Sequence, residues 1–361
     1  MVVNFSHERS EISTTRNNST DVSKHDGIRR RRLCMTDHVE LKERLRTCPN
    51  LPSSPAVAKR LIQLMESPCP DVEEIVQVLS SDSALTAKIL QLANSSIFPY
   101  KCKVTTLSKA AILVGYNGIL ATALSFTLVR HFRNERSSGL DLDLFWRRSL
   151  LVASACRAIG EVCGQKDTEE LFLAGLTQDI GMLALDRLNP DLYHSEALDQ
   201  SLHAEVVAHE REILGVDHAL AGSWLLTDWN FPSKICVAVQ FSDEARLFPD
   251  SEGPEKFYNC VGLGVILAGL IITHASDKTF LDQVDLAESC LGIDPFAFAQ
   301  ILRKLKDVVH ESEKLFEMNS HSEANLLQLM EQARTVLSRR HVPLANQFDA
   351  LFLQNAMPGA G

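Results

Sequence analysis

The sequence has few aromatic residues and no long apolar run. Aromatic residues make up 6% of its 361 residues, and its longest apolar run, Val261–Ile272, spans 12 residues. A helix needs about 20 apolar residues to cross a bilayer. The residues that follow the basic cluster Arg29–Arg32 soon turn polar, which is not typical of a signal peptide. We therefore expect a cytoplasmic protein without a membrane partner.

The sequence also lacks the motifs of several enzyme classes. Its nine cysteines include no CxxC pair and no zinc-ligand spacing, which predicts reduced cytosolic thiols. It has no P-loop, no GxGxxG motif and no nucleophile elbow. The sequence therefore offers no support for these enzyme classes.

The charge of the chain is acidic and unevenly distributed. The net charge is −10, but the first 36 residues are basic, which leaves 29 basic and 42 acidic residues in the rest. A body this acidic is not expected to bind nucleic acid. The polar segment 1–36 has almost no apolar periodicity and is predicted to be disordered. Met35 as an alternative start of the chain stays open.

The rest of the chain predicts one helix after another. Apolar residues recur with helical spacing, and no segment alternates with the period of a strand. Caps such as Asp71, and Asp82 or Ser83, and breakers such as Gly115 and Gly215 separate the segments. With 45% apolar residues the chain can bury a sizeable core, so we expect a compact all-α fold. The predicted helices include Ala56–Met65, Val72–Leu79, Ala84–Asn94, Leu107–Val114, Asn117–Phe132, Asp141–Cys163, Glu169–Leu188, His203–Leu214, Ala219–Trp229, Ser233–Ser242 and Phe257–His274, followed by helices from Asp294 to about Met318 and over Glu323–Arg339.

Several of these segments resemble the HDOD domains, which are non-catalytic relatives of the HD-type metal-dependent phosphohydrolases. The likeness opens at Leu51–Pro55, LPSSP, and continues in Ser81–Phe98, SDSALTAKILQLANSSIF, and Leu107–Leu120, LSKAAILVGYNGIL. It covers roughly residues 45–245. Shorter matching segments are Phe145–Leu150, Leu173–Leu176 and Leu214–His218.

The resemblance implies a metal site that has lost its ligands. In the phosphohydrolases a histidine, an adjacent His-Asp pair and a distal aspartate hold a divalent ion, which activates water. The matching positions here are Arg148 for the first histidine, Gln178 and Asp179 for the pair, and Gly269 for the distal aspartate. Asp179 is then the one ligand of that set still present.

Related cyclic-dinucleotide phosphodiesterases carry two adjacent histidines further along. The resemblance places Gln240 and Phe241 at those positions, while His218 remains. It therefore implies no metal ligands, no catalytic residues and no cofactor. We also expect Arg148 to replace the lost cation and to pair with Asp179 within about 4 Å, because both recur with apolar neighbours at helical spacing.

Other polar residues have simpler interpretations. His203 and His209 stand among charged neighbours on a polar helix, so they are expected to be solvated, and His218 is expected to have a structural role at a helix start. The segment Asp243–Lys256 reads as a polar loop.

The resemblance further implies an organisation and a function. We expect an HDOD domain over 37–245, with an N-terminal lobe at 37–135 and an HD-like core at 140–245 joined through 136–139. C-terminal helices at 246–345 complete the domain, and residues 346–361 fray.

The function implied is that of a bacterial signalling pseudoenzyme that is not catalytic and contacts a protein partner, with a homodimer left open. Two alternatives also stay open. One is residual hydrolysis of nucleotides or cyclic dinucleotides, and the other is nucleotide sensing without hydrolysis.

Overall fold

The structure is a computed structural model that describes most of the chain after residue 37. The described residues are 38–47, 56–67, 70–98, 100, 102–133, 137–194, 198–244, 254–318, 322–341 and 344–353. Within them the regular elements are helices, and no strand is present. The predicted all-α fold class is therefore confirmed for the described residues. The predicted tail at 1–36 lies outside the described residues.

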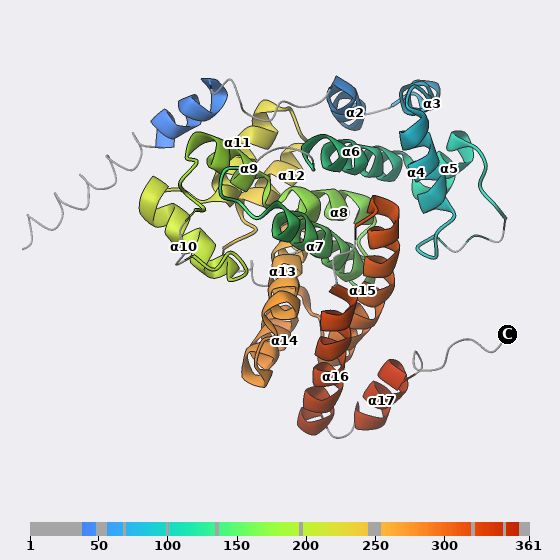
Figure 1. Ribbon diagram of the computed structural model, residues 1–361. Coiled ribbons are helices and arrows are strands. Elements are labelled where there is room, and N and C mark those ends of the chain that lie inside the picture. Colours follow the sequence, from blue (N-terminus) through green and yellow to red (C-terminus); the bar gives the residue numbers. More distant parts are fainter. Residues whose placement is uncertain are drawn as a thin grey trace, which may run out of the picture.

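The first part of the chain forms a layer of helices over the centre of the molecule (Figure 1). A helix at 38–47 precedes it. Asp71, Asp82 and Thr106 cap helices in this layer by accepting backbone N–H groups. The helices are α2 (Ala56–Met65), α3 (Val72–Ser80), α4 (Ser83–Ala93), α5 (Leu107–Val114) and α6 (Tyr116–Phe132).

The centre of the fold is α7 (Leu142–Val162), in which every residue from Arg148 to Gly160 is buried. It packs against α8 (Thr168–Thr177), α13 (Pro254–Thr273) and α15 (Pro295–Phe316). Gly175 of α8 lies so close to α7 that a Cβ would be 2.9 Å from the Cα of Ala153. This central packing fixes the direction of the side chains that α7 and α8 present.

A third group of helices lies to the left of α8 in Figure 1. α11 packs against α9 and α12, and α12 packs against α8. These helices are α9 (Ile180–Leu188), α10 (His203–Leu214), α11 (His218–Asp228) and α12 (Ser233–Gln240). The predicted single helix Glu169–Leu188 is wrong, since α8 ends at Thr177 and α9 begins at Ile180.

The segment that joins α6 to α7 is held in place by α9. The carboxylate of Asp186 accepts the backbone N–H groups of Ser138, Gly139 and Leu140 at 2.9, 3.0 and 3.3 Å. α6 and α7 are thus separate helices, as predicted. Residues 134–136 are not described, and the division into lobes at this junction stays a prediction.

The C-terminal helices extend away from the first layer (Figure 1). They are α13, α14 (Asp277–Leu291), α15, α16 (Ser322–Arg340) and α17 (Ala345–Leu353). α14, capped by Ser276, is absent from the predicted helices. The chain also stays helical after Ala345, where fraying was expected, because Phe348 and Leu351 are buried.

Among the described residues, α13 alone is a helix long and apolar enough by itself to span a membrane. Its most apolar window has a mean hydropathy of 1.7, and 67% of that window is buried inside the fold. α5 and α6 reach the same limit only when joined across a bend of 111°. A core helix has these properties too, so the finding is weak support for a membrane span.

Candidate metal centre

Two imidazoles reach one point from consecutive helices. His203 is the first residue of α10, and its side chain is 12% exposed. His218 is the first residue of α11 and is completely buried. Asp217 caps α11 by accepting the N–H of Leu220 at 2.9 Å, which fixes the start of the helix and therefore the backbone of His218.

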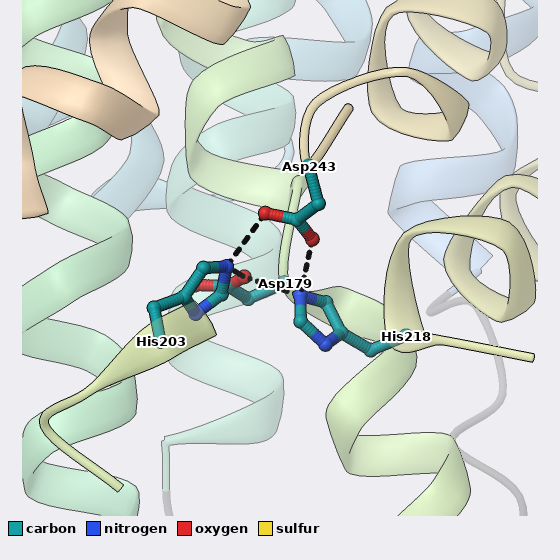
Figure 2. Close-up of side chains that lie close together, drawn as sticks. All are labelled: Asp179, His203, His218 and Asp243. Carbon is teal, nitrogen blue, oxygen red and sulfur yellow. Dashed lines mark hydrogen bonds and ion pairs between the residues drawn. The ribbon is translucent and has the colours of Figure 1, made fainter. Parts of the chain in front are cut away.

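Two carboxylates reach the same point from the ends of helices. Asp179 lies in the break between α8 and α9 and is completely buried, and Asp243 follows the end of α12. Figure 2 shows that these side chains point toward those of His203 and His218. One ligand atom from each of the four residues lies within 4.8 Å of the others. We call this group the Asp-His centre.

The ligand atoms of the Asp-His centre lie at hydrogen-bonding or ion-pair distances from one another. His218 Nε2 lies 3.0 Å from Asp179 Oδ1 and 2.8 Å from Asp243 Oδ2. His203 Nε2 lies 2.7 Å from Asp243 Oδ1 and 3.8 Å from Asp179 Oδ1. Ligand atoms around a tetrahedral zinc ion stand about 3.4 Å apart, given bonds of about 2.0–2.1 Å. Three of the four distances are shorter than this value, so these side chains would have to move slightly apart around an ion.

The hydrogen bonding of the centre is incomplete while both imidazoles are neutral. Both carboxylate oxygens of Asp179, Oδ2 of Asp243 and Nε2 of His218 are buried and make no well-directed hydrogen bond within the described part of the chain. Nδ1 of His218 is 2.7 Å from the carboxylate of Glu210. When that nitrogen carries the proton of a neutral ring, Nε2 presents a lone pair to carboxylate oxygens, which are also acceptors. A divalent transition metal fits this donor set of two carboxylates and two imidazoles.

The charges of the centre show that it needs additional positive charge. The carboxylates of Asp179, Asp243 and Glu210 outnumber the one guanidinium, that of Arg148, by two when both imidazoles are neutral. Such a buried excess requires protons or a cation. Two added protons or one divalent ion would neutralise it.

The pKa values of these groups are shifted by burial and by the neighbouring charged side chains. Burial lowers the pKa of His218, but the carboxylates of Glu210 and Asp243 outweigh it and raise this pKa well above its ordinary value. Burial raises the pKa of Asp243, yet His203 and His218 hold it well below its usual range. Burial also raises the pKa of Asp179, and the charge of His203 is the main cause of a net lowering.

Arg148 borders the Asp-His centre. Its Nε lies 3.2 Å from Oδ2 of Asp179, and its side chain is 6% exposed. The predicted ion pair between these two residues is therefore confirmed. The pair places a fixed positive charge beside one of the candidate ligands.

The structure places the remaining predicted positions differently. Gln178 is completely buried beside Asp179, and neither atom of its amide finds a hydrogen-bond partner among the described residues. Gln240 is exposed at the end of α12, with Phe241 after it. A Cβ on Gly269 would meet no atom within 4 Å. Of the predicted positions, Arg148, Asp179 and His218 therefore meet, whereas Gln240, Phe241 and Gly269 supply no ligand to the centre.

Sequence reasoning missed two residues of the centre, His203 and Asp243. His203 was expected to be solvated, but Val206, Val207 and Glu210 are buried on its helix, and the spacing 203, 206, 207, 210 defines one helical face. That spacing was the available signal. Asp243 was assigned to a polar loop, and it enters the centre from the turn at Phe241–Asp243, which follows α12. No local pattern shows such a turn.

Comparisons with known proteins agree with the fold. The HDOD domain family matches residues 51–245. Three solved structures share the fold, each under 25% identical to this chain. A "Putative metal-dependent phosphohydrolase" from Shewanella amazonensis SB2B is 19% identical with a TM-score of 0.58, covering 77% of this chain and 99% of that one.

An HDOD domain protein of unknown function from Geobacter sulfurreducens is 17% identical with a TM-score of 0.57, covering 88% of this chain and 99% of that one. A "Putative signal transduction protein" from Marinobacter aquaeolei VT8 is 19% identical with a TM-score of 0.50, covering 81% and 66%. An uncharacterized protein from Treponema pallidum is 22% identical over 247 residues, which are 68% of this chain and 46% of that protein. The chain thus spans about half the length of this relative.

One expectation has to be corrected. The chain was expected not to be an enzyme because Arg148, Gln178 and Gly269 stand where metal ligands were sought. This expectation is contradicted by the buried Asp-His centre, which offers another set of ligands for a metal ion. Arg148, Gln178 and Gly269 match the ligand positions of another family, whereas in this chain His203 and Asp243 complete the set with Asp179 and His218.

The family itself is established by the extent of the match. The matched segment 51–245 covers more than half of the chain and includes every residue of the Asp-His centre as well as Arg148. The chain belongs to the HDOD domain family.

Proposed function

We propose that this regulatory HDOD protein binds one divalent transition metal ion at the Asp-His centre. The observation that carries the proposal is the convergence of buried, unsatisfied ligand atoms from Asp179, His218 and Asp243, with His203 beside them. Two carboxylates and two imidazoles would hold the ion.

The reaction that such a centre supports best is hydrolysis of a phosphoester. A divalent ion in such a site supplies Lewis acidity to a phosphoryl oxygen and lowers the pKa of water. Arg148 keeps a positive charge next to Asp179, and the buried position of both residues limits the water around them. The name of the Shewanella structure supports this class of reaction.

The shape of the centre restricts the substrate. His203 is its most exposed side chain at 12%, and Asp179 and His218 are completely buried. A slender terminal phosphate approaching beside His203 fits this access better than an internal phosphodiester. We therefore expect small phosphomonoesters as substrates.

Metal analysis of the purified protein tests the proposal. We expect about one equivalent of iron, manganese or zinc after purification without chelators, and its loss in the Asp243→Asn and His203→Ala variants. His209→Ala is the matched control, since His209 is on the same helix but contacts the carbonyl of Leu192. Wild-type protein that takes up no divalent ion would refute the metal site.

Turnover of a phosphomonoester by metal-loaded protein tests the reaction separately. A rate of about 1 per second is modest for an enzyme, and we expect that rate to vanish with Asp243→Asn and to persist with His209→Ala. Stoichiometric metal without turnover on a panel of phosphomonoesters would restrict the function to metal-dependent regulation.

A second function, contact with a protein partner, is favoured by exposed apolar side chains. Tyr100 and Ile112 are 64% and 77% exposed, and Tyr116 is 39% exposed. Isolated exposed apolar residues are common, but aromatic residues are enriched in interfaces. We expect Ile112→Glu to weaken self-association or partner binding in sedimentation and pull-down measurements without changing metal content. Unchanged association would exclude Ile112 from the interface.

A further inference from the structure

Glu210 is a buried carboxylate that lies directly behind the Asp-His centre. It is on α10 and is completely buried. It accepts hydrogen bonds from the hydroxyl of Tyr193 at 2.6 Å, from Nδ1 of His218 at 2.7 Å and from the backbone N–H of His218 at 2.8 Å. Both of its carboxylate oxygens therefore accept hydrogen bonds, one from Tyr193 and the other from His218.

We propose that Glu210, held by Tyr193, is a positioning residue that fixes the tautomer and the orientation of His218 for metal binding. The inference rests on the proposed metal site. Metal-binding histidines usually donate their second ring N–H to a carboxylate or carbonyl, which orients the ring and makes it a better ligand. Glu210 occupies that place for His218.

Burial of Glu210 is costly, so its contacts require an explanation. Removing a carboxylate from water costs several kcal/mol unless hydrogen bonds compensate. Capping of α11 does not require Glu210 to contact the ring, because Asp217 already caps the helix and the N–H of His218 needs one acceptor. The contact to Nδ1 selects the ring nitrogen that faces Asp179 and Asp243 as the free ligand atom.

Helix α10 carries both a candidate ligand, His203, and the positioning residue Glu210. His203 and Glu210 are seven residues apart and lie on one face of the helix. α10 therefore supplies one candidate ligand directly and orients another, His218, from the next helix. Tyr193 anchors this arrangement from the segment before α10, with its side chain almost fully buried.

The test is the metal affinity of full-length Glu210→Gln, measured with zinc and manganese by calorimetry or chelator competition. A glutamine keeps the shape, accepts from His218 through its oxygen and donates to the Tyr193 hydroxyl, so the fold should persist. We expect affinity to fall about 10- to 100-fold, the usual effect of removing such a partner. Tyr193→Phe should produce a smaller loss. Glu212→Gln, which alters an exposed carboxylate on the same helix, is the matched control.

A spectroscopic readout separates positioning from a purely structural role. In zinc-loaded wild type, nitrogen-15 NMR should show His218 protonated at Nδ1 and bound through Nε2, with a Nδ1 proton signal that shifts in Glu210→Gln. Equal metal affinity of wild type and Glu210→Gln, or protonation at Nε2 in the wild type, would overturn the role of Glu210 alone. Wild-type protein that binds neither ion would overturn the metal site and, with it, this inference.

Discussion

The side chains around Asp179 form a small network of buried charges. Arg148, His203 and His218 all approach this carboxylate, and none of them is more than 12% exposed. Breaking a buried ion pair by removing one partner typically costs about 3–5 kcal/mol. Replacing both partners by apolar groups is often neutral. The network therefore makes predictions for single and double variants.

Arg148→Ala should destabilise the metal-free protein by about 3 kcal/mol, because it leaves the buried carboxylate of Asp179 with fewer partners. Denaturant unfolding in the presence of a chelator measures this change. The double variant Arg148→Met with Asp179→Leu should recover much of the loss. Purely additive effects of the two substitutions would show that the pair is not coupled.

The metal-free protein should lose stability as the pH rises above about 6.5, the ordinary pKa of histidine. The pKa of His218 is raised in the folded state, so its stabilising contribution is complete below the unfolded pKa and is lost as pH rises through the folded pKa. The pKa values of Asp179 and Asp243 are lowered, so titration of these carboxylates changes the stability near pH 4 and below, outside this window. Melting temperatures of chelator-treated protein from pH 6 to 9 check the slope, and a His218→Gln variant should flatten it.

At the scale of elements, the crossing of α9 and α11 brings Asp179 and His218 together. Gly181 of α9 packs against the first turn of α11, where a Cβ would collide with the His218 carbonyl and lie 2.6 Å from the backbone nitrogen of Gly222. Both neighbours are backbone atoms, which cannot rotate away. The close approach therefore depends on the absence of a side chain at Gly181.

Gly181→Ala should destabilise the protein by about 3 kcal/mol and weaken metal binding, since α11 must move away from Asp179. Gly269→Ala is the control, because its Cβ would meet no atom within 4 Å and Gly269 lies within helix α13. Alanine there should stabilise by up to about 1 kcal/mol and leave metal affinity unchanged. Chemical denaturation and metal titration of both variants test this contrast. Equal stability of Gly181→Ala and wild type would contradict the packing argument.

The sequence was sufficient for most elements because their signals are local. Caps such as Asp82 and breaks such as Gly115 mark helix ends, and apolar periodicity identifies the buried faces. Asp179 was recognised as buried for the same reason. The short break beside it was not recognised, because the apolar pattern continues through Gln178 and Asp179 and only contacts with α11 explain it.

The composition of the centre could not be derived in the same way. His203 and Asp243 have polar neighbours, and their function follows from distant segments that meet them. The family resemblance also directed attention to Gly269, which supplies no side chain. Tertiary convergence, rather than local sequence, decides which polar residues become ligands.

At the scale of the whole molecule, ligand binding and folding are linked. The candidate ligands belong to one part of the chain, from the end of α8 to the turn after α12, and this part packs on the central helices. An ion that binds only the folded chain stabilises it by about 2.7 kcal/mol when its free concentration is 100 times its dissociation constant. Metal removal should therefore lower the stability of the protein.

We expect the melting temperature to fall by several degrees when a chelator removes the ion, and to recover on adding zinc or manganese. Calcium should restore it poorly, because calcium prefers oxygen ligands. The Asp243→Asn variant should melt at the same temperature with and without chelator. A chelator effect that persists in this variant would place the ion elsewhere.

The order of the candidate ligands along the chain predicts how helices α9 to α12 open when the ion is bound. Asp179, His203, His218 and Asp243 are successive in sequence, so an ion bound to all four would close three consecutive loops of roughly 15 to 25 residues, as a reversible cross-link does. The helices inside these loops, α9 to α12, would then open together rather than one by one. Amide hydrogen exchange in this segment should slow when the ion binds, while α3 and α16 exchange at unchanged rates. The metal ion would thus rigidify helices α9 to α12 as one unit. A partner that binds these helices would respond to the ion without contacting it.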